Sequence, residues 1–253
     1  MNGYSLLKSI VKYGVSIVLL LAVWHMVTVI FHVPPYVLPA PRAVVETLVT
    51  EWPMFQRHAT VTLGNAVIGG LLGIGSGTLT GLSIAYSRTL RWIIEPYLVI
   101  FQSFPKEALI PVIVVWLGFG DSPKIVNAAL LSFFPMAVFT ANALLDTRSE
   151  YLELMRNWGA DKWQEFVFCR LPAGLQTIVG GLKITVPLAL IGAVLGEFMG
   201  GNEGLGYLIV SSGANFRLDR SFAALIILSA VGILALAMIR TIQDVVLKRY
   251  KQE

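Results

Sequence analysis

Long hydrophobic runs with few or no charges dominate the chain. A membrane-spanning helix needs about 20 apolar residues to cross about 30 Å of hydrocarbon, and six segments approach that length. They are residues 14–31, 61–86, 92–117, 125–145, 178–199 and 222–239. The pattern therefore predicts an all-α integral membrane protein with about six transmembrane helices.

The first apolar segment follows Lys8 and Lys12, as the core of a signal peptide would. It is longer than a usual signal core, no small-x-small cleavage site follows it, and a Pro-rich stretch comes next. We therefore expect an uncleaved first helix and an external loop. The expected divisions are residues 1–57 for this part, 58–242 for a transmembrane core and 243–253 for a cytoplasmic tail.

Composition supports the membrane assignment. Hydrophobic residues make up 56% of the 253 residues and charged residues 13%, whereas about a quarter of a soluble domain is charged. The net charge of +4 does not call for a nucleic-acid partner, because Lys and Arg gather on the cytoplasmic loops of membrane proteins. Cys169 is the one cysteine, which excludes an intrachain disulfide and a CxxC motif.

The distribution of Lys and Arg predicts the orientation. With a cytoplasmic N-terminus, the inner segments hold Lys8, Lys12, Arg88, Arg91, Arg148, Arg156, Lys162, Arg170, Arg240, Lys248, Arg249 and Lys251. The outer segments hold Arg42, Arg57, Lys124, Arg217 and Arg220. The excess on the inner side predicts that both termini are cytoplasmic.

Glycines recur at every fourth position in two of the predicted helices. Gly69, Gly73, Gly77 and Gly81 form one stripe, and Gly192, Gly196 and Gly200 form another. Small residues at this spacing let a second helix backbone approach closely, which stabilises helix packing in lipid. We assign both stripes to packing and not to the substrate.

The predicted inner loop at residues 146–177 is too polar to enter lipid and long enough to fold locally. Residues 150–158 suit a helix, and Gly159 suits its C-terminal end. Asp161 and Gln164 have the spacing of a capping box for a second helix, which we expect Pro172 to stop. The loop therefore predicts two short amphipathic helices joined at a glycine, on the cytoplasmic surface.

This loop resembles the cytoplasmic motif of ATP-binding-cassette (ABC) importer permeases. That motif runs Glu-Ala-Ala, three residues, Gly, nine residues, Ile-x-Leu-Pro. The chain has Glu153-Leu154-Met155, three residues, Gly159, nine residues and Cys169-Arg170-Leu171-Pro172. Four positions match in register, and apolar residues replace the two alanines and the isoleucine.

The resemblance implies a type-1 ABC importer permease in the bacterial inner membrane. The first helix of the motif would dock on a separate ATPase subunit, so ATP and Mg²⁺ would be bound by that partner and no cofactor by this chain. An extracytoplasmic solute-binding protein and a second permease copy, most simply an identical one, are the other implied partners. The implied ATPase-coupling residues are Glu153, Leu154, Met155, Gly159, Leu171 and Pro172.

Further stretches resemble the subgroup that imports nitrate, taurine and aliphatic sulfonates. They are residues 103–106, 110–111, 115–118, 132–135 and 204–206. A small anion is therefore the expected substrate. Similar permeases import pyrimidine or vitamin precursors and aromatic acids, so these substrates stay open.

Three charged residues within predicted spans are candidates for the transport pathway, because a charge inside a span usually faces a cavity or a partner. Lys106 and Glu107 follow Pro105, which interrupts the third span. Lys106 could meet an anionic substrate, or the two residues could neutralise each other at a structural bend. Glu197 could instead hold the outer loop at residues 204–206.

The sequence argues against two other classes of function. An intramembrane metalloprotease needs a pair such as His-Glu-x-x-His, which His25, His32 and His58 do not form, and no metal site is expected. A Gly-x4-Gly-Lys-Ser/Thr loop for ATP is also absent from the sequence. A secondary transporter is the nearer alternative, but such proteins often contain internal repeats, and none is visible.

Overall fold

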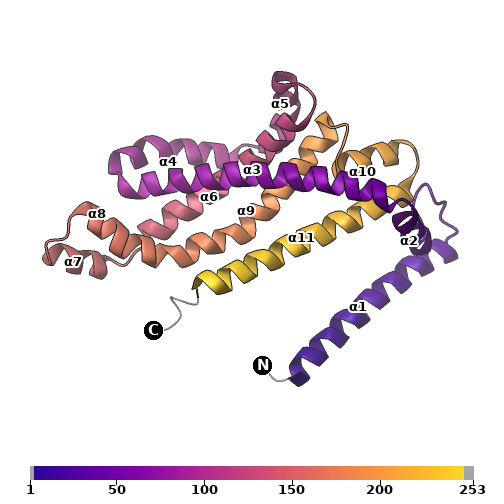
Figure 1. The fold of residues 1–253 in the computed structure, drawn as a ribbon, viewed down its shortest axis with the longest axis horizontal. Coiled ribbons are helices and arrows are strands. Elements are labelled where there is room, and N and C mark those ends of the chain that lie inside the picture. The colour runs from indigo at the N-terminus through magenta and orange to yellow at the C-terminus, as the bar shows by residue number, and fades with distance from the viewer. Residues whose placement is uncertain (1–2, 248–253) are drawn as a thin grey trace. The chain divides into compact units, whose positions relative to one another are not determined.

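The computed structural model describes the backbone of residues 3–247 and the side chains of residues 14–245. Every regular element in this part is a helix (Figure 1). The α-helices are α1 (Gly3–Ile30), α2 (Pro41–Thr50), α3 (Trp52–Tyr86), α4 (Arg88–Ser103), α5 (Ile110–Leu117), α6 (Asp121–Leu145), α7 (Ser149–Asn157), α8 (Lys162–Glu165), α9 (Leu171–Gly200), α10 (Leu205–Ala214) and α11 (Leu218–Leu247). A 3₁₀-helix, η1 (Lys106–Leu109), precedes α5, and a π-helical turn, η2 (Phe166–Arg170), precedes α9.

The number of spans agrees approximately with the prediction. In the described part, four helices are long and apolar enough to cross a membrane, and the bent pair of α4 with η1 and α5 makes up to five. The described apolar part of α1, residues 14–30, is shorter. The side chains of Lys8 and Lys12, and the tail residues Lys248, Arg249 and Lys251, lie outside the described part.

The chain divides into two compact units. Unit 1 contains residues 1–57 and 208–227, and unit 2 contains residues 58–207 and 228–253. In unit 1, the indole N–H of Trp24 donates to the carbonyl of Pro39 at 3.1 Å, and its ring lies against Phe222. The three predicted sequence divisions stay a prediction.

In unit 2, helix α9 packs extensively against α6. Both glycine stripes lie against α6. A Cβ added at Gly77 or Gly81 would come within 2.6 Å of an α6 backbone oxygen, and one at Gly192 or Gly196 within 2.7 Å of an α6 Cα. The stripes therefore pack two helices closely on α6, as the spacing predicts.

The interrupted third span is a sharp bend. Helix α4 ends at Ser103, and α4 and the segment from η1 to α5 meet at an angle of 86°. Pro105 precedes η1 with φ −71° and ψ 87°, which is not helical, and a proline removes a backbone donor that a continuous helix would use. The break therefore falls where the sequence predicts it.

The expectation that Pro172 stops a helix is wrong. Residues 162–200 run as one helical stretch, and Pro172 lies in the first turn of α9. The π-helical turn η2 immediately precedes this proline. A π turn shifts the backbone hydrogen-bond partners locally, which accommodates a residue that has no N–H to donate. The second helix of the loop therefore continues directly into a span.

Candidate functional site

Helix α7 and the start of α8 form a hairpin between the spans α6 and α9 (Figure 1). Leu152 is the buried residue of α7, and it anchors the helix by its apolar side. Tyr151, Leu154 and Trp158 are large, exposed and spaced along one side of the same helix. Helix α7 therefore presents a second apolar surface outward.

The turn of the hairpin is a Schellman motif. Gly159 has φ +80°, its N–H donates to the carbonyl of Arg156 at 2.9 Å, and the N–H of Ala160 donates to the carbonyl of Met155 at 3.0 Å. These two bonds satisfy carbonyls that the helix end would leave unpaired. The left-handed backbone at Gly159 is one that a β-branched residue strongly resists.

The helix after the turn begins with the predicted capping box. Asp161 Oδ1 accepts a hydrogen bond from the N–H of Gln164 at 2.8 Å, and Gln164 Oε1 accepts one from the N–H of Asp161 at 2.9 Å. Two donors that have no partner within the helix are thereby satisfied. Both ends of the turn are fixed by local hydrogen bonds, so the two helices keep a defined geometry.

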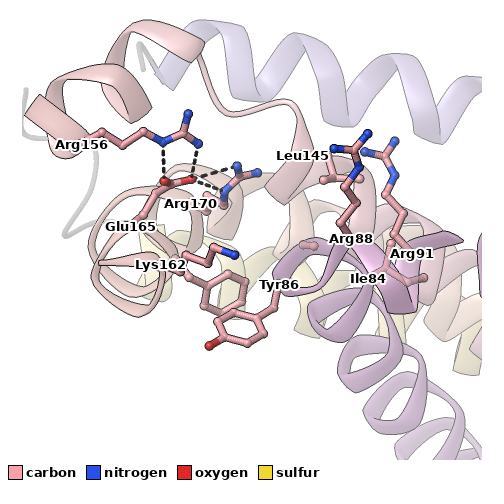
Figure 2. Close-up of a pocket in the computed structure, with 11 residues that line it drawn as sticks. Ile84, Tyr86, Arg88, Arg91, Leu145, Arg156, Lys162, Glu165 and Arg170 are labelled. Atoms are coloured by element: carbon pink, nitrogen blue, oxygen red, sulfur yellow. Dashed lines mark hydrogen bonds and ion pairs between the residues drawn. The ribbon is translucent and has the colours of Figure 1, made fainter. Parts of the chain in front are cut away.

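Glu165 joins the hairpin to the spans, and sequence reasoning missed it. Arg156 Nε and Arg170 Nη2 each donate to its carboxylate at 3.0 Å (Figure 2). Arg170 Nη1 also donates to the carbonyl of Leu144 at 3.2 Å. The bond to Glu165 also raises the pKa of the Arg156 guanidinium, so this arginine stays charged. One carboxylate thus connects α7, η2 and, through Arg170, the end of α6.

The predicted coupling residues differ in their exposure. Glu153, Leu154 and Gly159 are exposed and Met155 is partly buried. Leu171 is also partly buried and packs against a cluster that includes Leu144 and Phe166. The structure therefore brings Glu153 and Leu154 to the outer side of the hairpin, and places Leu171 and Pro172 where the hairpin joins α9.

The predicted pathway residues are not brought together. The Lys106 ammonium lies 5.3 Å from the centroid of the Phe134 ring, a cation–π distance. Glu107 is exposed, and no ion pair between Lys106 and Glu107 occurs in the described part of the chain. The bend therefore leaves Lys106 against an aromatic ring of α6.

Glu197 is buried and bonds to the loop after α9. The N–H of Gly206 donates to Glu197 Oε2 at 2.8 Å, and Thr62 Oγ1 donates to the same oxygen at 3.0 Å. The left-handed backbone of Gly204, with φ +119°, packs directly on this carboxylate, where a Cβ would overlap it. The contact that the sequence suggests between Glu197 and residues 204–206 is therefore present, and its role in transport stays a prediction.

Lys124 lies in the first turn of α6, and its place in an outer segment stays a prediction. It is 2% exposed, and its ammonium donates to Asp121 at 2.9 Å and to the carbonyl of Glu203 at 3.1 Å. Asp121, three residues before Lys124, was the signal in the sequence for this ion pair, since residues at this spacing meet on a helix.

Metal ligands do not gather in the part of the chain that the structure describes. No group of three or more His, Cys, Asp or Glu side chains there could hold a metal ion. The hairpin, with its fixed turn and exposed apolar side, is instead suited to contact another protein, because exposed apolar patches rimmed by polar residues mark interaction surfaces.

Comparisons with known proteins bear on this arrangement. The profile of a family described as "Binding-protein-dependent transport system inner membrane component" matches residues 69–252. The formylaminopyrimidine transport permease protein ThiX of Halalkalibacterium halodurans is 37% identical over 220 residues, which are 87% of this chain and 88% of that protein. The taurine transport system permease protein TauC of Escherichia coli is 25% identical over 236 residues, 90% of this chain and 86% of that protein.

Among solved structures, an inward-facing form of the MetNI methionine ABC transporter contains a similar chain. The TM-score is 0.66 at 22% identity, and the match covers 77% of this chain and 96% of the other. At this identity the match shows a shared fold. It agrees with the type-1 importer fold that the sequence motif predicts.

Proposed function

Since the chain belongs to the family of binding-protein-dependent transport system inner membrane components, we propose that it is an ABC importer permease whose transport is driven by a separate ATPase subunit bound at α7. ATP and Mg²⁺ would be held by that partner. The solute would be delivered by an external binding protein and leave into the cytoplasm. A second, identical permease copy would complete the pathway.

The observation that carries this proposal is the construction of the α7–α8 hairpin. Its turn is fixed by Gly159 and Asp161, and its outer side exposes Tyr151, Leu154 and Trp158. A flexible loop would absorb the movement of a partner, whereas a rigid helix with an apolar face can transmit it. Glu153 lies exposed on the same helix and supplies a polar contact.

The connection from the hairpin to the spans supports the same mechanism. Arg156 and Arg170 share Glu165, and Arg170 also donates to the last turn of α6. The helical stretch that starts at residue 162 continues to residue 200. A displacement of α7 would therefore be passed through Glu165 to the inner ends of both α6 and α9.

The test replaces two hairpin residues in the intact transporter. Glu153→Lys reverses the charge at the proposed contact, and Gly159→Val places a β-branched residue in a left-handed conformation. We expect both to abolish solute uptake and to reduce co-purification of the ATPase, while the chain still inserts into the membrane. Normal uptake by both variants would sink the proposal.

Matched controls keep this test specific. Glu150→Lys makes the same charge change at another exposed position of α7, one turn from Glu153, and should retain uptake. Gly159→Asn keeps a residue that tolerates the left-handed region and should retain more uptake than Gly159→Val. Equal loss in a variant and its control would indicate general damage to the hairpin.

We infer a small anion of the sulfonate type as the first candidate substrate. Lys106 supports this, because it lies at the bend of a broken span where a charge is expected to face a cavity or a partner. The similarity to a formylaminopyrimidine permease supports a pyrimidine precursor as the second. Lys106→Ala should lower uptake of labelled taurine and leave uptake of a neutral pyrimidine unchanged; unchanged taurine uptake would refute a role for Lys106.

On the outer side, the external binding protein would contact the Pro-rich loop at residues 33–41 and the segment at residues 202–219. Arg42 and Glu46 form an exposed ion pair of 2.7 Å in α2, which offers both charges to a partner. Crosslinking from this pair to the binding protein in intact cells tests the orientation. Crosslinks from α2 to the ATPase would reverse it.

A further inference from the structure

A hollow of about 650 Å³ lies between the start of α4 and the α7–α8 hairpin, within unit 2. Figure 2 shows Arg88 and Arg91 on one side of it and Arg156 and Arg170 on the other, with the Lys162 ammonium directed between them. Glu165 is the one carboxylate among the lining residues. Five cationic side chains therefore surround a space that contains a single negative charge.

The carboxylates of the protein leave much of this positive charge unbalanced. Arg156 and Arg170 share Glu165, and Arg91 pairs with Glu95 at 3.0 Å. Arg88 and Lys162 have no ion pair or side-chain hydrogen bond within the described residues. Like charges that line the same hollow repel one another, so a bound anion would stabilise the site.

The chemical class of the anion follows from the side chains that would donate hydrogen bonds to it. Four of the five cations are arginines, whose planar guanidinium groups bind phosphate oxygens in a bidentate way. A phosphate group with further substituents fits the volume, since the hollow is far larger than one phosphate. A second hollow of about 550 Å³ shares Arg88 and Arg91 and continues along α4 past Trp92 to Glu95, the carboxylate that pairs with Arg91.

The surroundings distinguish a lipid from a free phosphate. Tyr86, at the end of the span α3, lines the hollow, and Trp92 is 80% exposed beside it. Tyr and Trp gather at the level of lipid headgroups. Exposed Ile93, Tyr97 and Ile100 continue along α4, so acyl chains would have an apolar surface next to the phosphate site.

We propose that this basic hollow binds the phosphate group of an anionic phospholipid. Basic pockets between transmembrane helices on the cytoplasmic side suit such headgroups. The placement in the cytoplasmic leaflet rests on the proposed function and its orientation. The bound lipid would bridge α4 and the hairpin, and so set the position of the hairpin when no ATPase is present.

The experiment uses the full chain, purified without the ATPase and stripped of lipid in neutral detergent. Native mass spectrometry measures binding of phosphatidylglycerol, with phosphatidylcholine as the zwitterionic comparison and glycerol phosphate as the soluble headgroup. The variant carries Arg88→Gln and Lys162→Gln, which break no described contact. The control carries Arg148→Gln and Arg240→Gln, two exposed cations outside the hollow with the same total charge change.

We expect the wild-type chain and the control to bind phosphatidylglycerol in preference to phosphatidylcholine. Each cation near an anionic lipid contributes a factor of about five, so the double variant should bind about 25-fold more weakly. Equal binding by the variant and the control would overturn the proposal. So would displacement of the lipid by millimolar glycerol phosphate, which would assign the hollow to a soluble anion.

An acidic segment of the ATPase is the competing occupant. If the double variant binds lipid normally but no longer co-purifies with the ATPase, the proposal is overturned in favour of that protein contact. The lipid measurement needs no ATPase and no transport. Its failure is therefore distinguishable from failure of the proposed function, which shows in the uptake of the Glu153 and Gly159 variants.

Discussion

Glu51 and Glu165 are each held by two arginines, but they connect very different stretches of the chain. Glu51 lies in unit 1 and binds Arg217 and Arg220, which are 166 and 169 residues away in sequence. Glu165 lies in unit 2 and binds Arg156 and Arg170, which are nine and five residues away. The same carboxylate–arginine chemistry therefore joins distant segments in unit 1 and stiffens a local loop in unit 2.

The two clusters also differ in geometry. Arg220 makes two bonds to Glu51, at 2.7 and 2.8 Å, one to each carboxylate oxygen, the bidentate form that is the stronger one. At Glu165, Arg156 also reaches both oxygens, but at 3.0 and 3.4 Å, and both bonds from Arg170 go to the same oxygen, at 3.0 and 3.3 Å. The long-range cluster at Glu51 thus has the shorter hydrogen bonds. The local cluster at Glu165 connects more elements: α7, η2 and, through Arg170, the end of α6.

This difference predicts which property of the protein changes when each carboxylate is removed. Ordering two distant segments costs more chain entropy than ordering a short loop, so the contacts that hold distant segments matter for global unfolding. A local contact can open without unfolding the rest of the protein. We therefore expect Glu51 to matter mainly for stability and Glu165 mainly for the transmission of movement.

Glu197 offers a third arrangement, without arginine. It is 1% exposed, and its partners are the hydroxyl of Thr62 and the backbone of Gly206. Neutral donors and close packing hold this carboxylate, whereas charge pairs hold the other two. Screening by salt acts on charges near solvent, so added salt should weaken the Glu51 and Glu165 clusters and leave the Glu197 contacts nearly unchanged.

The largest effect on stability is expected for Glu51→Ala. The change leaves two neighbouring guanidinium groups without their shared anion, and we expect the free energy of unfolding to fall by about 2 kcal/mol, below the cost for fully buried pairs because Glu51 is 25% exposed. Thermal unfolding of the detergent-solubilised chain measures it. Glu46→Ala, in an exposed pair within α2, is the matched control and should change little.

A smaller loss of stability but a clear loss of transport is expected for Glu165→Ala. We expect the free energy of unfolding to fall by about 1 kcal/mol, because the change releases a local hairpin, while uptake falls at least about tenfold. Glu150→Ala removes an exposed carboxylate of α7 that has no described partner and should retain uptake. If Glu51→Ala impaired transport more than Glu165→Ala at equal protein levels, the contrast between the clusters would be wrong.

Local signals in the sequence predicted the hairpin well. Gly159 marks the end of α7, and Asp161 with Gln164 forms the capping box, because both motifs depend on residues within one turn of each other. The bend after Pro105 was predictable for the same reason. The glycine stripe predicted close packing but not its partner α6, since spacing on one helix does not name the neighbour.

Long-range and context-dependent features were not predictable. Nothing near Glu51 in sequence indicates Arg217 or Arg220, and nothing near Lys124 indicates the carbonyl of Glu203. Pro172 gave a misleading signal, because a proline that usually ends a helix is accommodated here by the preceding π turn. Sequence therefore predicted the shape of the α7–α8 hairpin but not the carboxylate that connects it to the spans.

The smallest expected effect is an acid-dependent loss of stability at Glu51. The bidentate bond from Arg220, and then that from Arg217, holds the pKa of Glu51 below its ordinary value of 4.5. A carboxylate with a lowered pKa in the folded state stabilises the protein fully above the pKa of the unfolded chain. That contribution is lost as the pH falls through the folded-state pKa.

We therefore expect the gap in melting temperature between the wild-type chain and Glu51→Gln to be constant near neutral pH and to narrow below the ordinary value of 4.5. The difference between the two proteins removes the contributions of the other carboxylates, including Glu165, because these titrate in both. A gap that stayed constant down to about pH 3 would mean that the Glu51 carboxylate is not stabilised by its arginines. In that case the long-range cluster would owe its effect to packing, and the contrast with Glu165 would rest on sequence separation alone.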